Sequence, residues 1–161
     1  MTAAQRLASQ IRRTVTGPMW HGPALDDVLA DITPAEAVSR PVAGAHSIWE
    51  LVLHIAVWAE VALARLGPEP LVSPEQDWPS VPQPTAEHWQ EAVDRLHTSH
   101  EELARVIEGM DDAALRGTVA LPGPRHTIEV MLHGVVEHGT YHGGQIMLLR
   151  RAVAAPVAAA K

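Results

Sequence analysis

Two histidines stand four residues apart near the C-terminal end of the chain, in the segment VEHGTYHGGQ (136–145). If this segment is helical, a step of four residues keeps His138 and His142 on one face, about 6 Å apart along the axis. Two imidazoles in this arrangement can converge on one metal ion, with zinc–nitrogen distances of about 2.0–2.1 Å. The segment therefore suggests a metal site that another part of the chain must complete.

A third histidine, His54, lies where apolar residues recur at helical spacing, among Leu51, Ile55, Trp58 and Val61. It belongs to the row that a helix would bury, as do His138 and His142 among Met131, Val135, Ile146 and Leu149. Burying three imidazoles is costly unless each finds a partner. Three histidines with one open position are typical of catalytic zinc sites. We predict that these three bind one metal ion; the competing interpretation is that they are hydrogen-bonded core histidines.

Three more residues are candidates for the surroundings of this metal. Gln145, one turn from His142, is placed to hydrogen-bond to that imidazole, or else lies at the surface. Glu50, one turn before His54, either orients that ring or caps its own helix. His21, in a Gly- and Pro-rich break, lies at a pocket mouth or on the surface. No general acid or base can be assigned from the sequence.

Other histidines fit the site less well. His97 and His100 lie beside acidic residues and are expected on a solvated helix face. His133 is five residues before His138, a spacing that points it away from the row of ligands.

Two adjacent glycines, Gly143 and Gly144, follow His142 directly. Each costs a helix about 1 kcal/mol relative to alanine, so a helical segment should keep them for a reason. One hypothesis is that they allow close helix packing or the approach of a ligand beside His142. The alternative is that one of them merely packs against a neighbouring side chain.

Several other kinds of site are disfavoured by what the sequence lacks. The chain has no cysteine, which excludes disulfides, thiolate metal sites and a cysteine nucleophile. Di-iron bundles use Glu-x-x-His, and the nearest approaches here have one residue too many. HExxH, GxSxG and a phosphate-binding glycine loop are also missing. A formal net charge of −7 argues against nucleic acid or an anionic membrane as a partner.

The histidines need long helices to position them, and the sequence predicts four of these, at residues 3–15, 47–66, 86–108 and 127–151. Thr85 and Thr127 stand where they can cap the last two, and Ser47 with Glu50 forms a capping box for the second. Shorter helical segments are expected at 24–32 and from the capping residue Thr33. Six prolines between residues 67 and 84 indicate a long connection that crosses over the bundle.

We therefore predict an all-α protein, a four-helix bundle with a long crossover loop. Its 161 residues suggest a single domain over residues 1–151, followed by a flexible tail at 152–161. No segment has the apolar length of a signal peptide core or a membrane span. A cytoplasmic location is expected.

Three segments resemble the DinB-like (DinB/YfiT-like) superfamily: WHGPALDDVLADITPAEA (20–37), GAHSIWELVLHIAVW (44–58) and HGTYHGGQIMLLRR (138–151). The resemblance covers most of the chain in order. It implies a four-helix bundle with one long crossover and a divalent metal on three histidines, which match His54, His138 and His142. Zinc or nickel is usual in the family, and members are often homodimers.

Characterised relatives in this superfamily include metal-dependent transferases of low-molecular-weight thiols, thiol-dependent maleylpyruvate isomerases and proteins labelled hydrolases. The resemblance thus implies a metal-dependent enzyme of the thiol S-transferase or hydrolase type. It would act on a small-molecule substrate, with a low-molecular-weight thiol as a possible co-substrate. The alternative is a non-catalytic metal- or ligand-binding protein of a stress response. A purely structural bundle with hydrogen-bonded histidines is a third interpretation.

Overall fold

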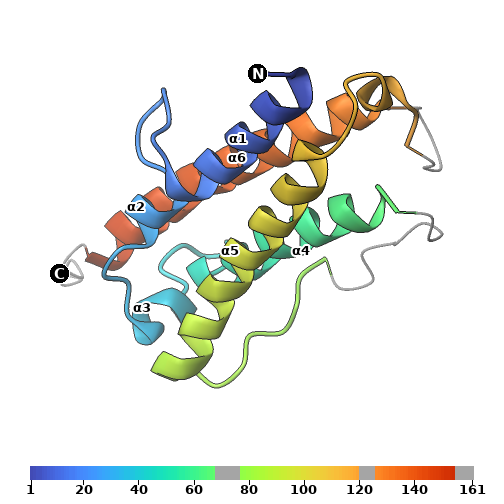
Figure 1. The fold of residues 1–161 in the computed structure, drawn as a ribbon. Helices are drawn as coiled ribbons and strands as arrows, with labels where there is room; N and C mark the ends of the chain where they lie inside the picture. The colour runs from blue at the N-terminus through green and yellow to red at the C-terminus, as the bar shows by residue number, and fades with distance from the viewer. Residues whose placement is uncertain (68–76, 120–125, 155–161) are drawn as a thin grey trace, which may run out of the picture.

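Helices are the regular elements of the computed structural model, which describes residues 1–67, 77–119 and 126–154. The four long helices are α1 (Ala3–Thr16), α4 (Ile48–Ala64), α5 (Ala86–Glu108) and α6 (Ile128–Ala154). Two short helices, α2 (Leu25–Leu29) and α3 (Pro34–Val38), and a 3₁₀ turn (Ala114–Arg116) lie in the connections (Figure 1). The predicted all-α class is confirmed.

The four long helices close into a bundle, because α5 packs against α1 and α4, and α6 packs against the same two helices. In Figure 1, α1 and α6 run in one direction, and α4 and α5 run in the other. Since α4 and α5 are parallel, the chain between them must return along the bundle, as the expected crossover requires. Residues 68–76 of this connection lie outside the described residues.

The helices begin where the sequence predicts. The side-chain oxygens of Thr33, Ser47 and Thr85 each accept a hydrogen bond from the backbone N–H three residues ahead. Thr127 does the same at the start of α6. The predicted ends differ more, because α4 stops at Ala64 and α6 continues to Ala154, into the expected tail. The rest of that tail lies outside the described residues.

Two apolar clusters fill the two ends of the bundle. One contains the first turns of α4 and α5 and the last turns of α6, with residues such as Trp49, Leu96 and Ile146. The other contains the opposite ends of the same helices, with residues such as Leu103 and Leu132. Between the residues of the two clusters lie His100 on α5 and His138 and His142 on α6, and His54 of α4 contacts His138. The predicted metal ligands therefore sit at mid-height in the bundle.

His100 corrects one expectation. Its side chain is only 1% exposed, so the prediction of a solvated face for this residue was wrong. The error follows from spacing, since Leu96 and Leu103 place His100 on the buried side of α5, while its acidic neighbours lie on the other side.

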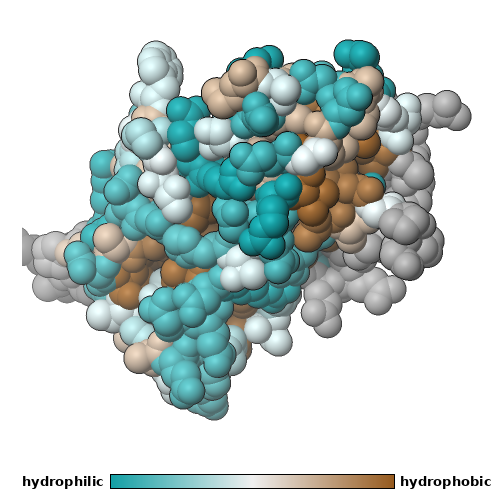
Figure 2. Space-filling view, viewed as in Figure 1, coloured by the Kyte–Doolittle hydropathy of each residue, from teal (hydrophilic) through white to brown (hydrophobic). Residues whose placement is uncertain are grey.

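Hydrophilic side chains follow α5 across the face shown in Figure 2, and hydrophobic residues are visible in the gaps on both sides of it. This pattern is that of an amphipathic helix lying over a core. Among the residues that the structure describes, no helix combines the length and apolar character needed to cross a membrane.

Candidate metal site

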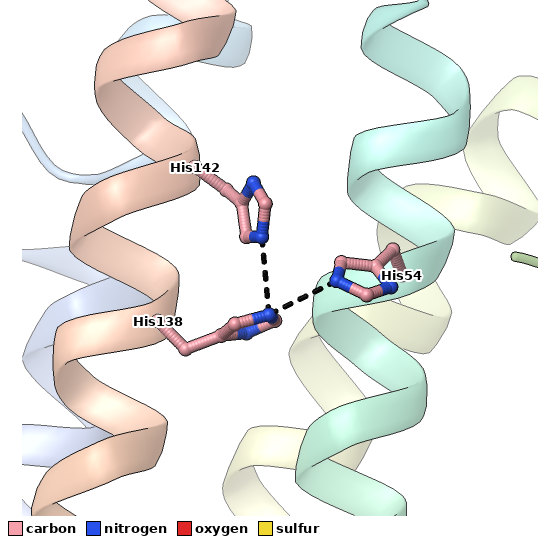
Figure 3. Close-up of side chains that lie close together, drawn as sticks. All are labelled: His54, His138 and His142. Atoms are coloured by element: carbon pink, nitrogen blue, oxygen red, sulfur yellow. Dashed lines mark hydrogen bonds between the residues drawn. The ribbon is translucent and has the colours of Figure 1, made fainter. Parts of the chain in front are cut away.

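Three imidazoles from two helices point at one another in the middle of the bundle (Figure 3). Nε2 of His138, on α6, lies 3.0 Å from Nε2 of His54, on α4. It lies 3.1 Å from Nε2 of His142, one turn further along α6. His54 and His142 are 5% and 7% exposed, and His138 is half-buried. The structure thus brings together the three histidines that the sequence singled out.

The tautomers of two of these rings follow from their outer hydrogen bonds. Nδ1 of His54 lies 2.7 Å from the carbonyl oxygen of Asp77. Nδ1 of His142 lies 2.6 Å from Oε1 of Gln145. Both oxygens can only accept, so Nδ1 carries the proton in each ring. The Nε2 atoms of neutral His54 and His142 therefore present lone pairs toward the same point.

Hydrogen bonds alone leave this arrangement incomplete. His138 can donate one Nε2–H to only one of the two lone pairs, so the other stays unsatisfied. Tetrahedral zinc would separate ligand nitrogens by about 3.3 Å, close to the distances observed. One divalent ion would accept all three lone pairs, with His138 in its Nδ1–H form. The three side chains are thus a geometric fit for a metal ion.

The protonation state of the site also suits a metal. Burial, together with the neighbouring imidazoles of His142 and His54, lowers the pKa of His138 to about 4. Burial lowers the pKa of His142 as well, with His54 contributing in the same direction. Metal ligands must be neutral imidazoles, so both rings are ready to bind at pH 7 without first losing a proton.

Asp77 and Trp58 hold His54 in place, and sequence reasoning missed both roles. Besides its carbonyl contact, Asp77 has a carboxylate oxygen 3.2 Å from Nδ1 of His54. The same oxygen accepts a 2.7 Å hydrogen bond from Nε1 of Trp58. A carboxylate or carbonyl behind a ligating histidine fixes its tautomer and orientation. Asp77 lies within the long connection between α4 and α5, where no periodic pattern predicts which side chain reaches the core.

Trp78 covers His54 on one side. Its ring stacks on His54 at 3.9 Å and on His46 at 3.5 Å between ring centres, each within 2° of parallel. Two imidazoles cannot occupy the same side of one indole at these distances, so Trp78 lies between them. The stack fixes the plane of the His54 ring and shields it from water.

The hydrogen bond expected between Gln145 and His142 is present, which gives a prediction. Gln145→Ala removes the acceptor from Nδ1 of His142 and frees the ring to rotate. We expect the affinity for zinc to fall about 10- to 100-fold, measured by competition with a chelating dye. Gln145→Glu, which keeps an acceptor oxygen, serves as the control and should retain most of the affinity. Equal affinity in the alanine variant would contradict this role.

Two other candidates lie away from the three imidazoles. Glu50 accepts from the backbone N–H of Ser47 at 2.7 Å and pairs with Arg40, so it caps α4 and does not orient His54. His21 is exposed and lines a small cavity of about 170 Å³ against α1, α2 and another face of α6.

The glycines of α6 differ in how closely they pack against other helices. A Cβ on Gly143 would lie 3.4 Å from Leu25 of α2, and one on Gly144 would meet nothing within 4 Å. The tightest position is Gly139, which the sequence analysis did not single out: a Cβ there would lie 2.6 Å from Cγ2 of Thr14 on α1. Gly139 therefore serves close helix packing, whereas a Cβ on Gly143 would stand at the edge of ordinary van der Waals contact, so close packing requires neither Gly143 nor Gly144.

A matched pair of substitutions tests this. Gly139→Ala is expected to lower the free energy of unfolding by about 1–3 kcal/mol, because the added methyl group meets the stiff side chain of Thr14. Gly144→Ala adds the same group in open space and should raise it by up to about 1 kcal/mol through helix propensity. Urea unfolding measures both. Changes of the same sign would contradict the packing assignment.

A cleft of about 370 Å³ opens beside the site, lined by His54, Trp58, Ala62, Arg65, Asp77, Met131, Gly134, Val135 and His138. Two of the three candidate ligands thus face a space large enough for a small molecule. Its walls are mostly apolar, which is typical of small-molecule sites with a few polar groups that orient the ligand.

Comparison with known proteins adds one match. A family model described as the DinB superfamily matches residues 20–146, which include His54, His138 and His142. Searches of curated proteins and of solved structures gave no match.

Proposed function

The chain belongs to the DinB superfamily, and we propose that His54, His138 and His142 bind one divalent metal ion, zinc or nickel, in a metal-dependent enzyme. The proposed reaction is a thiol S-transfer or a hydrolysis on a small-molecule substrate, with a low-molecular-weight thiol as co-substrate in the first case. A homodimer, which rests on the family resemblance, and a cytoplasmic location are part of the same proposal.

One observation carries the metal site: Nε2 of His138 lies within hydrogen-bonding distance of Nε2 of both His54 and His142, and those two atoms present lone pairs. Three protein ligands leave a tetrahedral ion one open position, as in catalytic zinc sites. A bound divalent metal supplies Lewis acidity and lowers the pKa of a coordinated water or thiol. The backbone carbonyl of Asp77 and the side chain of Gln145 hold His54 and His142 in one tautomer, and the apolar cleft offers a small molecule access to the site.

A non-catalytic metal- or ligand-binding protein is the second candidate. It is favoured by the scarcity of proton-transfer groups, since Asp77 is the carboxylate among the cleft residues and already accepts from Trp58. Glu137, which is near His138 in sequence, is exposed and does not line the cleft. Turnover of thiol-acceptor or ester substrates by the metal-loaded protein separates the two candidates.

Metal content is the test of the site. Elemental mass spectrometry on untagged protein, purified without chelator, should find about one equivalent of zinc or nickel per chain, and much less in His142→Ala. His133→Ala, an exposed histidine of the same helix, is the matched control and should keep the metal. Absence of metal in the wild-type protein, even after incubation with zinc and nickel, would contradict the proposal.

A further inference from the structure

Arg65 stands just after α4, and its side chain reaches back along that helix. Its Cζ lies 5.5 Å from the ring centre of Trp58, over the indole face. Its Nε is buried and has no hydrogen-bond partner among the residues that the structure describes. None of the ion pairs formed within residues 1–67, 77–119 and 126–154 includes Arg65.

This position contrasts with other arginines of the protein. Arg12, Arg40 and Arg95 each contact at least one glutamate. Burial lowers the pKa of Arg65, which reflects the cost of taking its charge out of water. The indole face offsets part of this cost through a cation–π contact, but it supplies no hydrogen-bond acceptor, and Nε finds none within the described ranges.

Arg65 shares its cleft with two of the candidate metal ligands, His54 and His138. Trp58 links them, since its ring lies 5.5 Å from Cζ of Arg65 and 6.0 Å from the ring centre of His138. The hydrogen bond from Nε1 to Asp77 fixes this indole. The remaining lining residues of this cleft are Ala62, Met131, Gly134 and Val135.

We infer that this cleft binds a small amphipathic anion, whose carboxylate or sulfonate group is held by Arg65 while its apolar body lies against Trp58 and points its other end at the three histidines. A guanidinium presents its N–H donors in a planar fork that matches such an oxyanion group. The inference deepens the proposed function, because the reacting end of the ligand would be the end at the metal site.

The first test measures the anion site without relying on the metal. Hexanesulfonate, a weak metal ligand, and its neutral analogue hexanesulfonamide are titrated into the full-length protein. The indole N–H signal of Trp58, assigned with Trp58→Phe, reports binding in ¹H–¹⁵N spectra. We expect the sulfonate to bind about tenfold more tightly than the sulfonamide. Arg65→Gln should remove this preference, and Arg65→Lys should keep part of it.

Arg13→Gln is the matched control, since it removes the same charge from an exposed position on α1. Equal affinities for sulfonate and sulfonamide in the wild-type protein would overturn the inference, whether or not Arg65→Gln folds. A preference that survives in folded Arg65→Gln would also overturn it.

The second test links the two ends of the cleft. Mercaptoalkanoic acids of increasing length and their primary amides are titrated into the cobalt-loaded protein, where thiolate–cobalt absorption reports binding at the metal. At one chain length the acid should bind about tenfold more tightly than the amide, and only with Arg65 present. Thiolate–cobalt absorption that shows no preference for the acid over the amide at any chain length would overturn the anion-site inference. It would leave the proposed metal site supported. Lack of any cobalt absorption, with the sulfonate preference intact, would contradict the metal site and leave the anion site supported.

Discussion

Chelation of the metal is expected to lower the melting temperature of the wild-type protein by about 10 °C. A ligand that binds only the folded state stabilises it by about 4 kcal/mol when its concentration is a thousand times the dissociation constant. In a chain of about 160 residues, 1 kcal/mol corresponds to about 2–4 °C in melting temperature. The effect should be large because the three histidines come from α4 and α6, so one ion joins two helices. Calorimetry with and without chelator measures it.

His138→Ala is expected to abolish this dependence. His138 lies between the other two imidazoles, within 3.1 Å of each, so its loss leaves two ligands on different helices. The affinity for zinc should fall more than about 100-fold, on the order of 3 kcal/mol for one ligand. The metal-free variant should melt close to the metal-free wild-type protein. A chelator effect of equal size in His138→Ala would show that the metal binds elsewhere, and His133→Ala should behave as the wild type.

The positions of His54, His138 and His142 were predictable from periodicity, because each falls in the apolar row of a strongly patterned helix. The first residues of the helices were equally predictable, because Ser47 and Thr85 cap α4 and α5 through contacts with neighbouring residues only. The same local reasoning left Glu50 between two roles, and the structure resolved it in favour of the cap.

The features that could not be predicted from the sequence depend on contacts between distant segments. Asp77 meets His54 across 23 positions, and the register of that meeting depends on how the long connection returns along the bundle. Gly139 is pressed against Thr14 because α1 and α6 run side by side, which no single-helix pattern reveals. His100 was misplaced because the acidic residues after it carried more weight in the interpretation than the apolar spacing around it.

His100 provides the second large prediction, a loss of stability in mild acid. The pKa of His100 is lowered to about 4, chiefly by burial and to a smaller extent by the nearby His97, against the opposing effect of the Leu96 carbonyl. Its Nε2 has no hydrogen-bond partner within the described part of the chain. In the unfolded chain this ring binds its second proton near pH 6.5. The folded state therefore binds that proton only at a much lower pH.

The sign follows from proton linkage. Between pH 6.5 and 4 the unfolded chain binds a proton at His100 and the folded protein does not. Acid therefore favours unfolding. The contribution of His100 to the free energy of unfolding is fully present above pH 6.5 and falls as the pH drops. It changes no further below about pH 4. The lowering of the pKa from 6.5 to about 4 corresponds to about 3 kcal/mol. Denaturant unfolding of the metal-free protein at a series of pH values measures this loss.

His100→Leu isolates the contribution of this one residue, because it removes the titrating ring and keeps an apolar side chain at the buried position. Burial also lowers the pKa of His138 and His142, but these rings titrate in both proteins, so their main effect cancels in the difference between the two curves. That difference should grow in favour of the variant by about 3 kcal/mol between pH 6.5 and 4. His133→Leu, at an exposed site, should run parallel to the wild type. Parallel curves for His100→Leu would mean that the buried ring accepts its proton without cost, which its missing Nε2 partner argues against.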